Sequence, residues 1–142
     1  MAKEKLFHVG VKALITNEKN QILILDVNGE LYGNKDAQWD IPGGRIQEGH
    51  TLEETLRREI EEEIGITKIS KPEFYTAVIS NHEIPLEGYK LGLIIMVLKV
   101  KIPLNSKIVL NVENLGYKWA SRKEAAKYLE HKYPIEFTSL LV

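Results

Sequence analysis

Glutamates are concentrated in residues 53–63, where six of the eleven positions are Glu and two are Arg. If this segment is an α-helix, with 100° per residue, Glu59, Glu62 and Glu63 lie in one sector of its surface. Like charges three or four residues apart destabilise a helix by about 0.2 to 0.5 kcal/mol per pair. These three carboxylates are therefore candidates for binding a cation, which would turn their repulsion into attraction.

Oxygen ligands of this kind suit a hard divalent cation. Mg²⁺ binds carboxylate, carbonyl and water oxygens, and it is commonly shared between one or two carboxylates and a substrate phosphate. The glutamate segment contains no Cys or His, which favours Mg²⁺ or Mn²⁺ over Zn²⁺. Gly43 and Gly44, in a predicted turn before the helix, would let the main chain approach a ligand or metal closely.

A solvated helix face is the other interpretation of the same glutamates. Arg57 and Arg58 would then compensate part of the negative charge. We prefer this interpretation for Glu53, Glu54 and Glu61. It fits the three glutamates of the shared sector less well, because solvated faces normally mix both signs of charge.

The helix that carries the glutamates has predicted ends. Thr51 with Glu54 three residues later is typical of a capping box, and Gly65 suits the left-handed residue that closes a helix. An apolar stripe with a spacing of four residues is formed by Leu52, Leu56, Ile60 and Ile64. The shared glutamate sector borders this stripe, so we expect its carboxylates at the edge of a core and partly desolvated.

Strands are predicted on both sides of this helix. Residues 7–15 alternate apolar and polar side chains with the period of two of a strand, and residues 21–27 form a second, more fully buried one. These two strands form a predicted hairpin. After the helix, residues 73–80 and 89–100 are predicted strands, joined by a loop over residues 81–88.

Shorter elements complete the predicted fold. Residues 108–110 and 115–119 are candidates for short strands. A second capping-box pattern, Ser followed by Glu three residues later, opens a predicted helix over residues 121–130, and a Pro opens a last one over residues 134–141. This order favours a single α/β (α+β) domain over residues 1–142, with a mixed sheet and helices on both faces.

Composition excludes several classes of function. With 142 residues and a net charge of −1, the chain lacks the basic field that holds a nucleic-acid polymer. It contains no Cys, which excludes disulfides and thiolate metal sites. Its longest apolar run, residues 91–98, is far shorter than the roughly 20 residues that cross a bilayer. We expect a cytoplasmic protein, monomeric or homodimeric, without a membrane partner.

Residues 44–66 resemble the signature of the Nudix (MutT-like) hydrolase family. That signature is a glycine, five residues, Glu, seven residues, then Arg-Glu-aliphatic-x-Glu-Glu-x-Gly-aliphatic. Eight of its nine specified positions are in register, namely Gly44, Arg58, Glu59, Ile60, Glu62, Glu63, Gly65 and Ile66. The preceding string WDIPGG, residues 39–44, is also similar to that family.

One position departs from the signature. His50 stands where the family usually has its first Glu. Glu48 or Glu53 could replace that carboxylate, or His50 is simply a solvated residue before the helix, which is the interpretation we favour. The departure leaves the predicted metal site intact and puts only an auxiliary role of the first carboxylate in question.

The resemblance implies an α/β/α sandwich that hydrolyses a nucleoside diphosphate linked to another group, by attack of water on phosphorus. It implies that Glu59, Glu62 and Glu63 bind Mg²⁺ or Mn²⁺ together with the Gly44 carbonyl. Either Glu62 or Glu59 would take the proton of the water. Arg58 would orient a metal-binding Glu through charge-assisted hydrogen bonds; alternatively it makes an ordinary surface ion pair.

The substrate is less well defined by the sequence than the reaction. Arg45 is a candidate for contacting a phosphate and Trp39 for stacking on a base, although each also suits an ordinary surface or packing role. His82 and Glu83 are weaker candidates on a predicted loop. Further aromatic candidates for stacking are Tyr32, Phe74, Tyr75 and Tyr89.

Nucleoside or deoxynucleoside triphosphates are the leading prediction for this small-molecule nucleotide substrate. ADP-ribose, nucleotide sugars and dinucleoside polyphosphates are alternatives, because the family's subgroup markers are not found downstream of the signature. A Nudix-like domain that senses a nucleotide without cleaving it is a further alternative. An acidic helix that docks another protein is a third, but it leaves the glycine pair unexplained.

Overall fold

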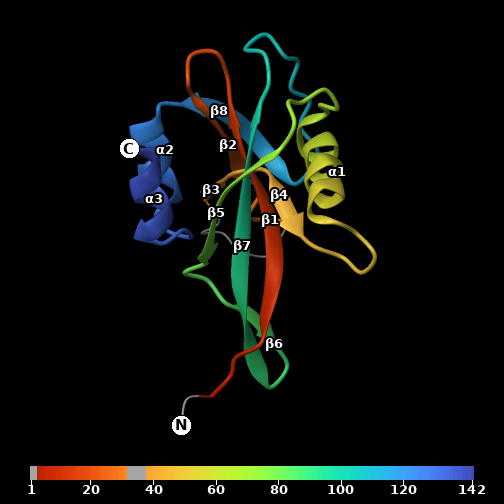
Figure 1. Cartoon of the computed structure of the whole chain (residues 1–142), viewed down its shortest axis with the longest axis vertical. Coiled ribbons are helices and arrows are strands. Elements are labelled where there is room, and N and C mark those ends of the chain that lie inside the picture. Colours follow the sequence, from red (N-terminus) through yellow and green to blue (C-terminus); the bar gives the residue numbers. More distant parts are fainter. Residues whose placement is uncertain (1–2, 32–37) are drawn as a thin grey trace.

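The computed structural model describes residues 3–31 and 38–142. Within them, a mixed β-sheet is covered by helices on both faces (Figure 1). The strands are β1 (Phe7–Thr16), β2 (Ile22–Val27), β3 (Trp39–Asp40), β4 (Gly43–Arg45), β5 (Glu73–Ile79), β6 (Ile84–Leu86), β7 (Tyr89–Lys101) and β8 (Asn114–Ala120). The helices are α1 (Leu52–Ile64), α2 (Arg122–Leu129) and α3 (Ile135–Leu141).

The central strands of the sheet follow the order β3-β2-β1-β7-β5. β1 and β7 are parallel along their full overlap, from Phe7 opposite Gly92 to Thr16 opposite Lys101, while the other pairs are antiparallel. β4 pairs with β1, β6 with β7, and β8 with β2. The predicted mixed sheet is thus confirmed, and β1 and β2 are antiparallel neighbours as the hairpin prediction required.

Two hydrophobic cores fill the space between the sheet and the helices. On one face α1 packs its stripe, including Leu56 and Ile60, against buried side chains of β1, β2 and β7. On the other face Leu129 of α2 and Phe137 of α3 pack against the opposite side of the same strands. The predicted arrangement of helices on both faces is therefore confirmed, and α1 is separated from α2 and α3 by the sheet (Figure 1).

The ends of the helices follow the predicted capping signals. Thr51 accepts from the Glu54 amide and the Glu54 carboxylate accepts from the Thr51 amide, which completes the capping box of α1. Gly65 closes the helix with a left-handed φ of 71°, a conformation that glycine adopts without steric cost. Ser121 and Glu124 form a second capping box at α2. Since each cap satisfies backbone groups that the helix leaves free, the local sequence defines where α1 begins and ends.

Three predictions about short segments were wrong. Gly43 and Gly44 lie in strand β4, not in a turn, because β1 offers them an antiparallel partner. The predicted loop over residues 81–88 contains β6, which pairs with the start of β7. Residues 108–110 are not a strand; the Val109 amide instead donates to the Ile64 carbonyl at 2.9 Å and closes the end of α1.

Across the described ranges, no helix has both the length and the apolar character needed to span a bilayer.

Candidate active site

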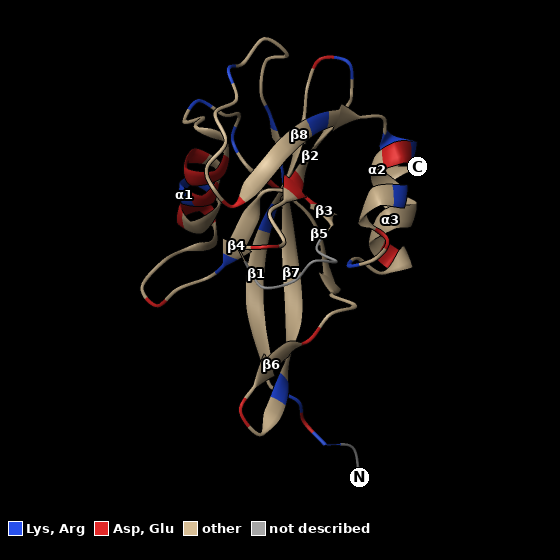
Figure 2. Cartoon of the chain, turned by 180° about the vertical axis from the view of Figure 1, so that it is seen from behind, with Lys and Arg blue, Asp and Glu red and all other residues tan. Residues whose placement is uncertain are grey.

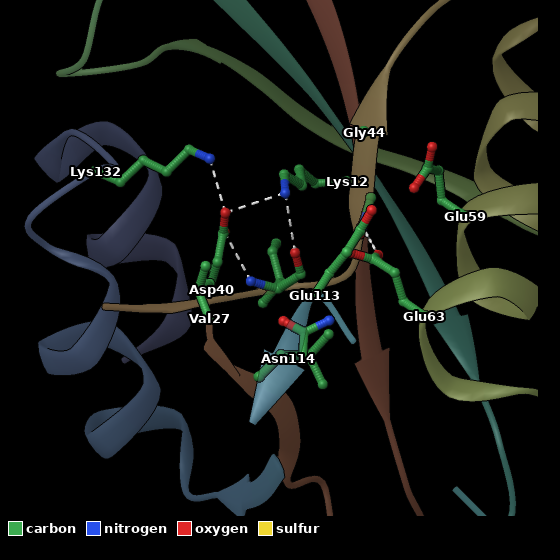
Figure 3. A pocket seen from close by; sticks show the side chains of 12 residues that line it. Lys12, Val27, Asp40, Gly44, Glu59, Glu63, Glu113, Asn114 and Lys132 are labelled. Carbon is green, nitrogen blue, oxygen red and sulfur yellow. Dashed lines mark hydrogen bonds and ion pairs between the residues drawn. The ribbon is translucent and has the colours of Figure 1, made fainter. Parts of the chain in front are cut away.

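A cavity of about 340 Å³ lies between α1, the sheet and the segment that joins α2 to α3 (Figure 3). α1 is rich in acidic residues (Figure 2), and two of them, Glu59 and Glu63, line the cavity. The described residues that line the cavity are Lys12, Leu25, Val27, Asp40, Ile41, Gly43, Gly44, Glu59, Glu63, Glu113, Asn114 and Lys132. It therefore combines part of the predicted site with residues that are distant in the sequence.

The two glycines of β4 hold the carboxylates of α1 at close range. The Gly43 amide donates to Glu63 Oε2 at 2.7 Å. Gly43 has a φ of +149°, which favours glycine, and a Cβ there would lie only 2.1 Å from the Val11 carbonyl oxygen. A Cβ on Gly44 would lie 2.6 Å from Glu59 Oε1. The glycine pair thus lets the main chain approach two carboxylates closely, from a strand instead of the predicted turn.

Glu59 and Glu63, packed against Gly43 and Gly44, form what we call the acidic wall of the cavity. Ionisation of these two carboxylates costs free energy. Burial raises the pKa of Glu63 to about 7, although the Lys12 ammonium and the Gly43 amide oppose the shift. Burial likewise raises the pKa of Glu59, with a further contribution from the negative charge of Glu62. Positive charge inside the cavity would therefore be stabilising.

Arg58 contacts the carboxylate that its predicted role requires. Its guanidinium donates to Glu59 Oε1 at 3.2 Å and to Gln47 Oε1 at 3.1 Å. Both bonds constrain the orientation of the planar guanidinium, and the first constrains Glu59 as well. Arg58 is therefore in a position to orient Glu59.

Glu62 differs from its two neighbours in the predicted metal site. Its side chain is exposed and is not part of the cavity lining, although its charge acts on Glu59. Within residues 3–31 and 38–142, no group of three or more His, Cys, Asp or Glu side chains is close enough together to hold a metal ion. The structure thus places Glu59 and Glu63 at the cavity, whereas Glu62, which was predicted to share their sector, lies outside the lining.

The donor set nevertheless fits Mg²⁺ or Mn²⁺ chemically. Glu59, Glu63 and Glu113 give the cavity three carboxylates, and Gly44 belongs to the same lining with its main chain. Hard oxygen ligands of this type are those that Mg²⁺ prefers. Burial raises the pKa of Glu63 despite the Lys12 ammonium and the Gly43 amide, so a bound cation would favour the charged form of this carboxylate.

Opposite this acidic wall lies a buried network centred on Asp40 (Figure 3). Asp40 Oδ2 accepts from Lys12 Nζ at 3.1 Å and from Lys132 Nζ at 2.7 Å. Asp40 Oδ1 accepts from the Tyr133 hydroxyl at 2.6 Å and from the Ile41 amide at 2.8 Å. Burial acts to raise the pKa of Asp40, but the two ammonium groups outweigh it and hold this pKa well below its usual range.

Sequence reasoning missed the lining residues outside the signature. Lys12 is a polar position of the alternating strand predicted over residues 7–15, yet its side chain is only 12% exposed. A signal was present in the sequence, because Lys12 is the one Lys, Arg, Asp or Glu among residues 7–15, which are otherwise mostly apolar. Glu113 and Lys132 carried no comparable local signal.

Several predicted substrate residues lie outside the cavity lining. Trp39 is half-buried and packs against Tyr128, with 5.6 Å between ring centroids. Arg45 is exposed at the end of β4. His50, which we interpreted as a solvated residue before the helix and not as a substrate residue, is half-buried, and its Nδ1 atom is buried without a hydrogen-bond partner among the described residues, so the ring is only partly solvated. Tyr32 lies outside the described residues.

The remaining candidates are also placed away from the cavity. Phe74 and Tyr89 are exposed at 63% and 55%, while Tyr75 packs against Phe137 and donates to the Leu140 carbonyl. The His82 ring lies tilted beside the His131 ring, and Glu83 forms an ion pair with Lys5. None of Phe74, Tyr75, Tyr89, His82 and Glu83 lines the cavity.

Comparison with known proteins identifies the family of this chain. The NUDIX domain family model matches residues 6–140. An 8-oxo-dGTP diphosphatase from Haemophilus influenzae is 41% identical over 58 residues, which cover 40% of this chain and 40% of that protein. An RNA pyrophosphohydrolase from Coxiella burnetii is 38% identical over 61 residues, covering 43% of this chain and 25% of that protein. The chain thus matches well under two thirds of the length of these relatives.

Solved structures match nearly the whole chain. A MutT protein from Methanosarcina mazei Go1 is similar with a TM-score of 0.72 and 25% identity, covering 99% of this chain and 96% of that chain. An Ap4A hydrolase from C. elegans has the same fold with a TM-score of 0.72 and 18% identity, covering 94% and 92%. Since the family model also spans most of the chain, the protein belongs to the Nudix (MutT-like) hydrolase family.

Proposed function

We propose that this protein is a divalent-metal-dependent nucleotide pyrophosphohydrolase, which cleaves a nucleoside diphosphate linked to another group by attack of water on phosphorus. The observation that carries the proposal is the packing of the Glu59 and Glu63 carboxylates against Gly43 and Gly44 inside the cavity. Hydrolysis of a phosphoric anhydride depends mainly on positioning and on neutralising phosphate charge, and a divalent cation bound beside Glu59 and Glu63 would do both.

Glu59, Glu62, Glu63 and the Gly44 carbonyl are the proposed metal ligands. A bound Mg²⁺ or Mn²⁺ supplies positive charge that stabilises the phosphoryl oxygens as negative charge develops on them. Glu62 is exposed and follows Glu59 by three positions on α1, a spacing at which two side chains of a helix are neighbours. Glu113 is a further acidic residue at the cavity.

The remaining steps belong to side chains of the chain itself. Glu62 or Glu59 accepts the proton of the attacking water, and Arg58 keeps the Glu59 carboxylate oriented through its 3.2 Å contact. Lys12, which is held in the cavity by Asp40, provides a fixed positive charge near the phosphates. Nucleoside or deoxynucleoside triphosphates are the proposed substrates, in keeping with relatives named as 8-oxo-dGTP diphosphatases.

The test is a hydrolysis screen with Mg²⁺ and with Mn²⁺ over nucleoside triphosphates, ADP-ribose, nucleotide sugars and dinucleoside polyphosphates, with each product identified. We expect turnover that EDTA abolishes and that yields a nucleoside monophosphate. Absence of turnover on every substrate would instead favour the nucleotide-sensing alternative.

Replacing Glu62 with Gln provides the matched test of the acidic wall. We expect Glu62→Gln to keep the fold, because the side chain is exposed, and to slow turnover by at least ~100-fold. Glu61→Gln, which removes the same charge from an exposed neighbour, should stay close to wild type. Near wild-type turnover of Glu62→Gln at saturating Mg²⁺ would contradict the assignment.

A further inference from the structure

The half of the cavity opposite the acidic wall is rich in hydrogen-bond donors. Lys12 reaches it from β1 and Lys132 from the segment between α2 and α3 (Figure 3), and Asn114 lines the same cavity from the start of β8. Asp40 is the acidic residue that lies between the two ammonium groups. This half therefore carries two positive charges against one negative charge.

Asp40 has no remaining capacity to bind a ligand. A carboxylate offers about four lone-pair sites, and the hydrogen bonds from Lys12, Lys132, Tyr133 and the Ile41 amide occupy four of them. Its role is consequently to hold the two ammonium groups side by side, both bound to the single oxygen Oδ2. Asp40 is thus a positioning residue and not a metal ligand or a base.

The two lysines keep donors to spare. Each ammonium has three N–H bonds; in the described structure Lys12 uses two, to Asp40 and to the Ile41 carbonyl, and Lys132 uses one, to Asp40. Three N–H bonds therefore remain for a ligand. Asn114 adds to them, because its amide nitrogen is buried without a hydrogen-bond partner among the described residues and its side chain lines the same cavity.

The ligand group that satisfies these donors must be rich in acceptor oxygens and negatively charged. A phosphate meets both requirements, since all its outer oxygens accept hydrogen bonds. A base would gain most from an aromatic surface to stack on. Among the described residues that line the cavity there is no aromatic side chain, so the lining favours a phosphate over a base.

We propose that Lys12 and Lys132, oriented by Asp40, form an anion subsite that binds the terminal phosphate of the substrate. The proposal rests on the proposed function, because the acidic wall then holds the phosphates at the bond that is hydrolysed. The anion subsite would select substrates with a free terminal phosphate, such as nucleoside triphosphates. Substrates that carry a second nucleoside or a sugar at that end cannot use the subsite.

Lys132→Met is the variant that tests the subsite. It removes one ammonium, retains an apolar stem of similar length, and leaves Asp40 paired with Lys12, so no buried charge loses its last partner. Lys127→Met is the matched control, because Lys127 is exposed on α2. If Lys132→Met does not fold, the comparison of Lys132→Gln with Lys132→Arg replaces it, with the charge restored only in the Arg variant.

The first measurement is binding of inorganic tripolyphosphate by calorimetry in EDTA, which needs no turnover. Loss of a hydrogen bond to a charged group predicts at least ~10-fold weaker binding by Lys132→Met and no change for Lys127→Met. Equal binding by wild type and Lys132→Met would overturn the subsite. Because this readout is independent of hydrolysis, it separates failure of the subsite from failure of the proposed function.

The second measurement compares kcat/KM for a nucleoside triphosphate and for a dinucleoside polyphosphate with Mg²⁺. For Lys132→Met we expect kcat/KM on the triphosphate to fall at least ~10-fold, mainly through a higher KM. Its kcat/KM on the dinucleoside polyphosphate should change little. An equal loss on both substrates would overturn the proposal. The proposal would also be overturned if Lys132→Met changed the preference among bases but not the preference for a free terminal phosphate. That result would assign Lys132 to binding of the base.

Discussion

Replacing Glu63 with Gln removes the charge of a carboxylate that is only 8% exposed. Its pKa in the folded protein is about 7, raised from the ordinary value of 4.5 by burial. Between pH 4.5 and pH 7, Glu63 is protonated more in the folded state than in the unfolded state, so the free energy of unfolding falls as the pH rises. At about 1.4 kcal/mol per pKa unit, ionisation of Glu63 costs the metal-free protein about 3 kcal/mol above pH 7.

The assay is urea unfolding in EDTA between pH 4.5 and pH 8. The substituted Gln side chain stays neutral, and its amide oxygen can still accept from the Gly43 amide, which donates to Glu63 at 2.7 Å in the native protein. We expect the wild type and Glu63→Gln to be similar near pH 4.5. The variant should then become more stable than the wild type by up to about 3 kcal/mol at pH 8. Mg²⁺ at pH 8 should stabilise the wild type more than the variant, because it compensates the buried charge.

Glu61→Gln serves as the control, because it removes a charge from the exposed side of the same helix. A stability difference between wild type and Glu63→Gln that does not vary with pH would refute the reasoning. A wild type that gains stability relative to the variant as the pH rises would refute it as well. Either result would mean that Glu63 is already compensated by Lys12 and that the cavity does not call for a cation.

Two further substitutions test how α1 is positioned against β4. Gly44→Ala should displace the Glu59 carboxylate, because a Cβ would lie 2.6 Å from Oε1; we expect turnover to fall about 100-fold while the free energy of unfolding changes by less than about 1 kcal/mol. Steady-state kinetics and urea unfolding check this, and unchanged turnover would argue against the close contact. Thr51→Ala should cost about 1 kcal/mol in urea unfolding through loss of the α1 cap; an unchanged midpoint would contradict that role.

Much of the fold could be predicted because its signals are local. The capping box at Thr51, the left-handed Gly65 and the four-residue stripe of α1 each involve neighbours in sequence. The failures arose where long-range pairing decides the structure. Gly43 and Gly44 have the composition of a turn, and only the partner strand β1 makes them a strand. Residues 108–110 have strand-like composition, but their backbone is used to close the end of α1.

The candidate site likewise combines residues with local sequence signals and residues that only long-range contacts bring together. Helical periodicity placed Glu59, Glu62 and Glu63 in one sector of the helix, and two of them, Glu59 and Glu63, do project toward β4. Helical periodicity alone did not reveal that Glu62 is exposed, since a helical wheel ignores what packs beside it. Lys132 is 92 residues from Asp40 in the sequence, so their contact depends on how α2 and α3 fold over the sheet.

The most direct test of the acidic wall as a divalent-cation site is binding of Mn²⁺, measured by electron paramagnetic resonance of the free ion without substrate. We expect saturable binding by the wild type, binding at least ~10-fold weaker for Glu63→Gln, and wild-type binding for Glu61→Gln. Absence of saturable binding by the wild type would contradict the account, as would equal losses in the buried and the exposed variants.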